Sequence, residues 1–214
     1  MANLITLSRL LLLIVVVVIA YQPYTWWHIL NVALLILVFV SDGLDGYVAR
    51  KRNETSVFGA MFDIASDRIV ELTMWIVLVD LAIVPVWVPL VFIIRGTIVD
   101  TIRANQVSTS GESPFSMLQS PVGKWIVAGK FMRGFYAAVK ATTFCWLLLV
   151  RALIALWPNF FAGWVTAFEI IGSLLVYLSV LTCIVRGLPV VWEFVYQERE
   201  SLAPGIARSR RSRS

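Results

Sequence analysis

The sequence predicts an all-helical integral membrane protein with six transmembrane helices and both termini in the cytoplasm. Hydrophobic residues make up 59% of the 214 residues, and charged residues make up only 14%. The mean hydropathy is +0.83. Soluble domains carry about 25% charged residues, so this composition excludes the ordinary soluble classes. Apolar runs also recur along the chain at close to the length that crosses a bilayer, about 20 residues.

Six apolar segments are the candidate spans, because only a helix satisfies all of its own backbone hydrogen bonds in lipid. We expect no cleavable signal peptide in the first, whose apolar stretch is long and lacks a small-residue cleavage site after it. Pro85 predicts a tight turn between the third and fourth spans. The predicted spans are Leu4–Ala20, Trp27–Ser41, Ile64–Val84, Val86–Ile102, Phe131–Val150 and Trp164–Ile184.

Basic residues predict the orientation of the spans. Arg50, Lys51 and Arg52 follow the second span, and the chain ends in R-S-R-R-S-R-S, whereas the opposite loops together hold one arginine, Arg151. Cytoplasmic loops carry the excess of lysine and arginine in membrane proteins. Both termini and the loop after the second span are therefore predicted to be cytoplasmic.

The predicted domain plan has two parts. Residues 1–186 form a six-helix catalytic domain, and residues 187–214 form a cytoplasmic segment with a basic, disordered tail. We expect the tail to rest on anionic lipid headgroups rather than to bind nucleic acid. Because no targeting segment is recognisable, we expect a multi-pass protein of a prokaryotic plasma membrane with its active site facing the cytoplasm.

Four carboxylates occur where the second and third spans meet. Asp42 and Asp45 are three residues apart, and Asp63 and Asp67 are four apart, so each pair lies on one helix face. If the two helices pack side by side, four like charges converge, which is costly unless a cation lies between them. Hard divalent cations prefer oxygen ligands. The pattern predicts a site for Mg²⁺ or Mn²⁺, with two ions expected.

Small residues and an arginine lie between the carboxylates. Gly46, Ala49 and Gly59 would let a bulky headgroup approach the helix backbone, and Arg50 offers a planar set of donors for a phosphate. The alternative is a solvated acidic patch paired with neighbouring basic residues. Four carboxylates in this spacing favour the metal site and chemistry on a phosphate-bearing substrate.

The complete pattern is D-x2-D-G-x2-A-R-x8-G-x3-D-x3-D, from Asp42 to Asp67. It resembles, at all eight of its fixed positions, the signature of the CDP-alcohol phosphotransferases, also called CDP-alcohol phosphatidyltransferases. The resemblance includes the plan of six spans with the motif across the second and third. It implies an enzyme of phospholipid biosynthesis that transfers a phosphatidyl group from a CDP-diacylglycerol-type lipid to an alcohol and releases CMP. It also implies a homodimer.

The resemblance further implies roles for single residues. Asp42, Asp45 and Asp63 would bind metal and the CDP diphosphate, while Asp67 would lie near the metal and act as the general base. The residues expected to bind CDP are Asp42, Gly46, Ala49, Arg50 and Gly59.

The acceptor alcohol is predicted from shorter matches. The opening with Asn3, Thr6 and Arg9, and the stretch Pro121–Trp125, are similar to those of phosphatidylglycerophosphate synthases, which implies glycerol 3-phosphate as the acceptor. The pair Arg95-Gly96 departs from the Arg-Glu pattern expected there. Inositol and inositol phosphate therefore stay open as alternative acceptors.

Cationic side chains on the fourth and fifth spans bear on the same question. Charged residues at membrane depth are costly unless they face a cavity or a partner. They would either bind the acceptor's phosphate, for which Arg103, Lys124 and Arg133 are the candidates, or have a structural role. The structural roles are ion pairs with Asp100, Glu71 or Glu169 and extension of the side chain to the membrane surface. The same two readings apply to Lys130. We expect Lys140 to be structural, and Glu71 to be paired or to lie just behind the metal ligands.

Two other classes of protein, a transporter and a non-catalytic paralogue, fit the sequence less well. A transporter with its cation site at the aspartates would need charged groups through to the outer face, where the sequence has few. A non-catalytic paralogue would have lost a position of the motif, and none is lost. Cys145, Cys183 and the single histidine, His28, form no cluster, so neither a zinc site nor a disulfide framework is expected.

Overall fold

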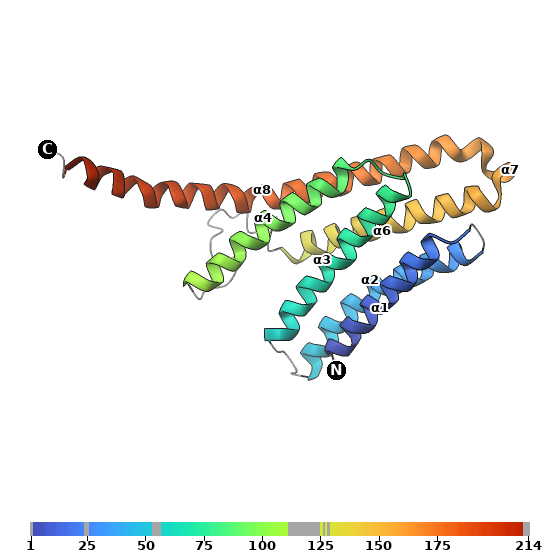
Figure 1. Cartoon of the computed structure of the whole chain (residues 1–214), viewed down its shortest axis with the longest axis horizontal. Coiled ribbons are helices and arrows are strands. Elements are labelled where there is room, and N and C mark those ends of the chain that lie inside the picture. Colours follow the sequence, from blue (N-terminus) through green and yellow to red (C-terminus); the bar gives the residue numbers. More distant parts are fainter. Residues whose placement is uncertain are drawn as a thin grey trace. The chain divides into compact units, whose positions relative to one another are not determined.

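The structure, a computed structural model, describes residues 2–23, 26–52, 57–110, 125, 127 and 129–211. Every regular element in this part of the chain is a helix (Figure 1). The helices are α1 (Ala2–Ala20), α2 (Trp27–Arg52), α3 (Val57–Asp80), α4 (Trp87–Ser110), α6 (Lys130–Leu156), α7 (Pro158–Phe161), the 3₁₀-helix η1 (Ala162–Trp164) and α8 (Val165–Arg211). The all-helical fold class is therefore confirmed.

Each predicted span lies largely in one helix, but several helices extend beyond their spans. α2 continues past Ser41 to Arg52, and α3 begins at Val57, ahead of Asp63. The aspartate motif is thus carried on helical backbone at its two ends. α8 continues through the predicted domain boundary after residue 186, so that boundary and the disordered tail stay predictions.

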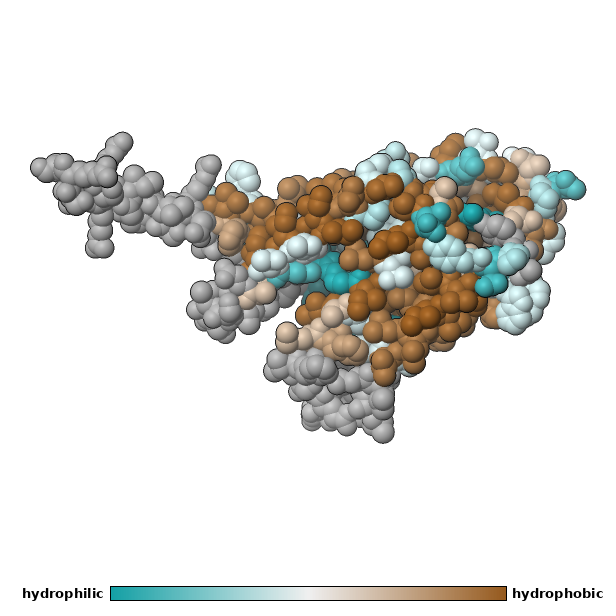
Figure 2. Space-filling view, viewed as in Figure 1, coloured by the Kyte–Doolittle hydropathy of each residue, from teal (hydrophilic) through white to brown (hydrophobic). Residues whose placement is uncertain are grey.

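Length and composition support a membrane protein. Among the described residues, Phe131–Leu156 and Pro158–Tyr196 are long and apolar enough to cross a bilayer, and two shorter apolar helices cover Thr6–Ala20 and Trp27–Asp42. Hydrophobic residues dominate the described surface in Figure 2, and large apolar side chains such as Leu174 are 63% exposed. Extensive exposed apolar surface is unusual for a soluble monomer and is expected for helices in contact with lipid.

The chain divides into two compact units. The first comprises Met1–Pro89 and Ala138–Leu178, and the second comprises Leu90–Ala137 and Ser179–Ser214. The boundaries fall inside α4, α6 and α8, so each of these helices contributes to both units.

The core of the first unit forms around Phe144 of α6. Its ring stacks on Phe39 of α2, with centroids 6.1 Å apart, and meets the edge of Trp75 of α3 at 4.6 Å. Trp75 and Phe144 are completely buried. α1 packs against both α2 and α3, and the Asn31 side chain of α2 donates a hydrogen bond of 3.0 Å to the Val16 carbonyl of α1. α1, α2 and α3 are therefore held side by side.

Polar contacts link neighbouring segments of the first unit near the C-terminal end of α3. The Tyr21 hydroxyl donates a 2.7 Å hydrogen bond to Asp80, which raises the pKa of Tyr21 because the tyrosinate would face that carboxylate. Arg151 of α6 donates to the Leu81 carbonyl. Asp80 therefore has a structural partner at this end of α3.

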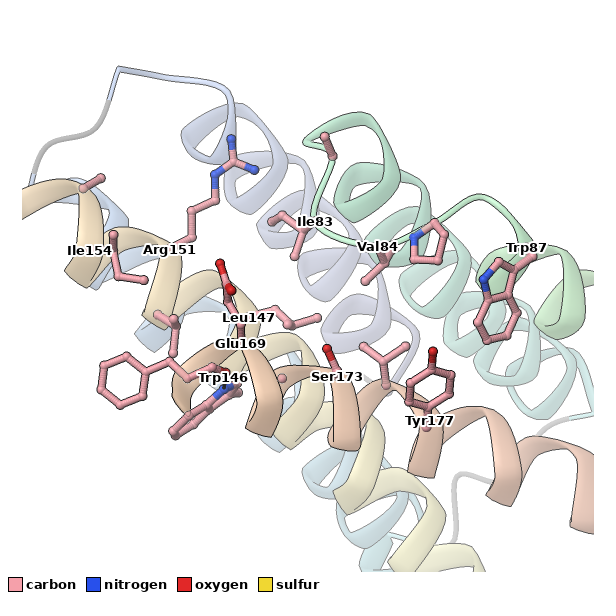
Figure 3. A pocket seen from close by; sticks show the side chains of 17 residues that line it. Ile83, Val84, Trp87, Trp146, Leu147, Arg151, Ile154, Glu169, Ser173 and Tyr177 are labelled. Carbon is pink, nitrogen blue, oxygen red and sulfur yellow. Dashed lines mark hydrogen bonds between the residues drawn. The ribbon is translucent and has the colours of Figure 1, made fainter. Parts of the chain in front are cut away.

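A cavity of about 660 Å³ opens beside the turn that follows α3 (Figure 3). Its walls come from that turn, α6 and α8, and its polar groups include Arg151, Glu169 and Tyr177. Asp67 precedes the turn by about four helical turns, or roughly 20 Å at 1.5 Å per residue. The cavity and the aspartate motif thus lie at opposite ends of α3.

The second unit has its own apolar core and a pair of arginines around one tyrosine. Val99, Ile102, Val127 and Val190 pack together. Arg186 of α8 donates hydrogen bonds to the carbonyls of Val127 (3.2 Å) and Met132 (3.3 Å). The guanidinium carbons of Arg186 and Arg95 lie 5.0 Å and 5.9 Å from the centroid of the Tyr136 ring, within the range of cation–π attraction. This unit therefore buries positive charge against an aromatic face.

The aromatic core of the first unit can be tested by replacing Trp75 with alanine. Because Trp75 is completely buried against Phe144, we expect Trp75→Ala to lower the free energy of unfolding by about 3–5 kcal/mol. The measurement is reversible unfolding in mixed detergent micelles. Ile76→Ala is the matched control, because Ile76 is 55% exposed, and its effect should be much smaller. Equal effects of the two substitutions would contradict this packing.

Candidate metal and catalytic site

The structure brings together three of the four predicted aspartates. Asp42 lies on α2, while Asp63 and Asp67 lie one turn apart on α3. One carboxylate oxygen from each side chain lies within 4.8 Å of the other two. The side chains are 40%, 47% and 55% exposed in the same order. Two helices that pack against the same neighbour, α1, thus present a group of carboxylates that solutes can reach.

The donor atoms suit a hard divalent cation. Every ligand atom offered by these three residues is a carboxylate oxygen, the type that Mg²⁺ and Mn²⁺ prefer. The Oδ1 atoms of Asp42 and Asp63 are buried; Arg9 pairs closely with Asp42 Oδ1 but lies 3.6 Å from Asp63 Oδ1. A buried acceptor without a close donor is costly, and an ion beside Asp63 Oδ1 would remove that cost. The cluster therefore fits a metal ion.

The electrostatics of Asp63, which precedes the predicted third span, agree with that conclusion. Burial raises the pKa of the Asp63 carboxyl, the neighbouring Asp67 carboxylate raises it further, and Arg9 acts in the opposite direction. A raised pKa means that the negative charge is held against an unfavourable environment. A cation bound beside Asp63 would relieve this.

Arg9 of α1 is the site residue that the sequence analysis missed. Its Nη1 atom forms an ion pair with Asp42 and lies 3.1 Å from Asp67 Oδ1, and its Nη2 atom lies 3.6 Å from Asp63 Oδ1. The sequence analysis used Arg9 only as part of a match for the acceptor. A charged residue within the first apolar segment, which is costly without a partner, was the signal that could have identified it.

A second charged group lies one helical turn further along α3. Glu71 is 4% exposed and accepts hydrogen bonds from Arg68 Nη1 at 2.9 Å and from Lys140 Nζ of α6 at 2.8 Å. These ion pairs confirm the expectation that Glu71 is paired and that Lys140 is structural. They tie α3 to α6 directly beyond Asp67.

The other predicted site residues are less fully described. Gly59 lies on α3 and is half-buried, and Arg133 is an exposed residue of α6 in the second unit. Lys124 lies outside the described residues. The backbone is helical but the side-chain positions fall outside the described part at Asp45, Gly46, Ala49, Arg50, Arg103 and Lys130. Their roles stay predictions.

Comparison with known families decides the assignment. The sequence profile of the CDP-alcohol phosphatidyltransferases matches residues 1–192, which include all of α1 to α6 and most of α8. The chain belongs to the CDP-alcohol phosphatidyltransferase family. This membership confirms the resemblance drawn from the aspartate motif and the expectation of a transferase enzyme. The clustered carboxylates on α2 and α3 lie within the matched residues.

Individual relatives in this family are bacterial enzymes named CDP-diacylglycerol–glycerol-3-phosphate 3-phosphatidyltransferase. The Bacillus subtilis protein is 28% identical over 135 residues, which cover 58% of this chain and 69% of that protein. The Pseudomonas fluorescens protein is 32% identical over 78 residues, or 36% and 40% of the two chains. The Wigglesworthia glossinidia protein is 30% identical over 101 residues, or 46% and 55%. The matched part thus spans about half the length of the last two relatives.

The buried ion pair beside the site leads to a prediction about stability. We expect Lys140→Met to lower the free energy of unfolding by about 1–3 kcal/mol, because it removes the ion pair that Lys140 forms with the buried Glu71. In the double variant Glu71→Gln/Lys140→Met this loss should largely disappear, since no buried carboxylate is left behind.

Thermal unfolding in detergent, followed with a thiol-reactive dye, measures the effect. Arg133→Gln is the control, because it removes an exposed charge from the same helix. A double variant as unstable as Lys140→Met alone would show that the lysine stabilises α6 by another route.

Proposed function

We propose that this protein transfers the phosphatidyl group of a CDP-diacylglycerol-type lipid to glycerol 3-phosphate and forms phosphatidylglycerophosphate. The observation that carries the proposal is the group of carboxylates on α2 and α3 in a member of the CDP-alcohol phosphatidyltransferase family. The choice of acceptor is supported by the relatives, whose names specify glycerol 3-phosphate.

The proposed reaction is a displacement at phosphorus. The hydroxyl oxygen of the acceptor forms a bond to the phosphorus that carries the diacylglycerol. The bond from that phosphorus to the oxygen that bridges the diphosphate breaks, and CMP leaves with that oxygen. Such transfers depend on positioning and on neutralisation of charge more than on covalent catalysis. The protein therefore has to hold two negatively charged substrates in line.

The carboxylates have two proposed tasks. Asp42, Asp45 and Asp63 would hold one or two Mg²⁺ or Mn²⁺ ions, and Asp67 would contribute to the same site. When bound, the metal supplies positive charge that neutralises the diphosphate and stabilises the leaving group. Asp67 would accept the proton of the attacking hydroxyl, for which a carboxylate with anionic neighbours is suited. Gly46, Ala49, Arg50 and Gly59 would bind the CDP part of the donor.

Cationic residues of the second unit support a phosphorylated acceptor. Arg133, with Arg103 and Lys124, would bind the acceptor's phosphate. Arg95 and Arg186, both close to Tyr136, add positive charge to the same unit. Inositol phosphate also carries a phosphate that these residues could bind, whereas free inositol does not. Acceptor specificity therefore has to be measured.

The proposed setting of the enzyme follows from its substrates. A lipid donor stays in the bilayer while a sugar or glycerol phosphate comes from the cytosol, so the site must open to both. We propose six crossings with both termini and the aspartates on the cytoplasmic side of a prokaryotic plasma membrane, and a homodimer as the working form. The apolar helices Phe131–Leu156 and Pro158–Tyr196 support the membrane assignment.

A panel of acceptors tests the proposed reaction. Purified protein in detergent, given CDP-diacylglycerol and Mg²⁺, should release CMP and form a lipid product with glycerol 3-phosphate. Inositol, inositol phosphate and serine should give little or none. The measurements are CMP release and mass spectrometry of the lipid. Turnover with inositol phosphate instead would retain the reaction class and overturn the acceptor, and no turnover with any member of the panel would count against both.

The role of Asp67 leads to a separate prediction. We expect Asp67→Asn to lower kcat by at least about 100-fold, the usual range for loss of a general base, while CDP-diacylglycerol still binds. Asp80→Asn is the control, because Asp80 lies at the other end of α3 and bonds to Tyr21. If Asp67→Asn abolishes donor binding and turnover together, Asp67 is a metal ligand rather than the base.

A further inference from the structure

The position of Arg9 differs from that of a residue that binds substrate. Its side chain is 1% exposed, whereas the carboxylates of Asp42, Asp63 and Asp67 are 40%, 47% and 55% exposed. The guanidinium therefore lies on the protein side of the carboxylates, and their accessible side remains available to a metal ion or a diphosphate. A molecule entering the site would meet the carboxylates before it reached Arg9.

The contacts of Arg9 are also incomplete for a buried guanidinium. Its Nη1 atom serves Asp42 and Asp67, but its Nε and Nη2 atoms are buried and donate no hydrogen bond to any described residue. Nη2 lies 3.6 Å from Asp63 Oδ1, which is beyond a normal hydrogen bond. The positive charge of Arg9 thus attracts all three carboxylates, while its N–H groups bond closely to only two of them, Asp42 and Asp67.

We propose that Arg9 is the built-in counter-ion of the aspartate cluster. It holds Asp42, Asp63 and Asp67 together before metal arrives, and it lowers their affinity for divalent cations. Arg9 is a positioning residue in this role, which rests on the proposed metal-dependent function of the cluster.

The charge count supports this role. Among the described side chains, three carboxylates and one guanidinium have a net charge of minus two, to which Asp45 of the same motif would add one more negative charge. Without Arg9 the same carboxylates would carry minus three and would repel one another at distances below 5 Å. Arginine keeps its proton under all ordinary conditions, so this compensation is permanent and does not depend on pH.

Other cations near the site are already engaged. Arg68 and Lys140 both bond to Glu71, and in the described part of the chain the ion pairs of Asp42, Asp63 and Asp67 are all made by Arg9. Loss of Arg9 should therefore remove the cation that makes these ion pairs.

The test compares Arg9→Gln with two further variants, Arg9→Lys and Arg68→Gln. Arg9→Lys keeps the charge, and Arg68→Gln removes a charge from α3 that pairs with Glu71. Thermal unfolding is measured first in EDTA and then in Mg²⁺ or Mn²⁺. The affinity for Mn²⁺ is measured by electron paramagnetic resonance of the free ion. Neither measurement requires turnover.

We expect Arg9→Gln to melt at a lower temperature than the parent in EDTA and to regain most of the difference when metal is added. We expect its dissociation constant for Mn²⁺ to fall about tenfold or more, because a positive charge within a few ångströms of the ion no longer opposes binding. Arg9→Lys should retain much of the parent behaviour, and Arg68→Gln should change Mn²⁺ affinity much less. Unchanged or weaker Mn²⁺ binding by Arg9→Gln would overturn the proposal.

A second pair of variants covers the case in which Arg9→Gln alone does not fold. In the Asp42→Asn background one carboxylate charge is already gone, so adding Arg9→Gln should cost less stability in EDTA than it does in the parent. A folded double variant beside an unfolded single variant supports the counter-ion role. If the penalty is the same in both backgrounds, or if neither protein folds, Arg9 acts through packing and the proposal fails.

These outcomes are independent of the acceptor. Tighter Mn²⁺ binding by Arg9→Gln combined with no turnover in the acceptor panel would leave the counter-ion role intact and reject the proposed reaction. The opposite combination, turnover in the panel with no change in Mn²⁺ affinity, would retain the reaction and reject the counter-ion role.

Discussion

The mutual repulsion of the carboxylates on α2 and α3 is the constraint on which the rest of the site depends. Their oxygens lie within 4.8 Å of one another, a spacing that three negative charges hold only with positive charge beside them. Arg9 supplies that charge from α1, the helix that packs against both of the others. The packing of α1 against α2 and α3 therefore also determines how the three carboxylates are arranged and compensated.

The same physical rule applies one turn further along α3, with a different result. Glu71 is almost completely buried and is neutralised by Arg68 and Lys140, so it is a fixed link between α3 and α6. The aspartates retain 40–55% exposure and one cation among three, so they keep capacity for a further ion. Differences in exposure and charge balance, rather than in residue type, separate the structural carboxylate of Glu71 from those of the aspartate cluster.

The two compact units carry different charged groups. The first contains the carboxylate cluster, whose oxygen atoms fit a divalent cation. In the second, Arg186 is buried and Arg95 is half-buried beside the Tyr136 ring, and Arg133 is exposed on α6. Negative charge thus gathers in one unit and positive charge in the other.

The sequence by itself determined the fold class, one helix for each apolar segment, the family and the identity of the motif aspartates. These properties are local, because hydropathy acts over about 20 residues and the motif occupies one continuous stretch from Asp42 to Asp67. Only the tertiary structure decided that Arg9 pairs with the aspartates and that Lys140 pairs with Glu71, 69 residues away. An ion pair depends on which helices pack together and at which register. Apolar periodicity does not encode that information. From the sequence alone, Arg9 was therefore only part of an N-terminal match, and its role at the site follows from the packing of α1 against α2 and α3.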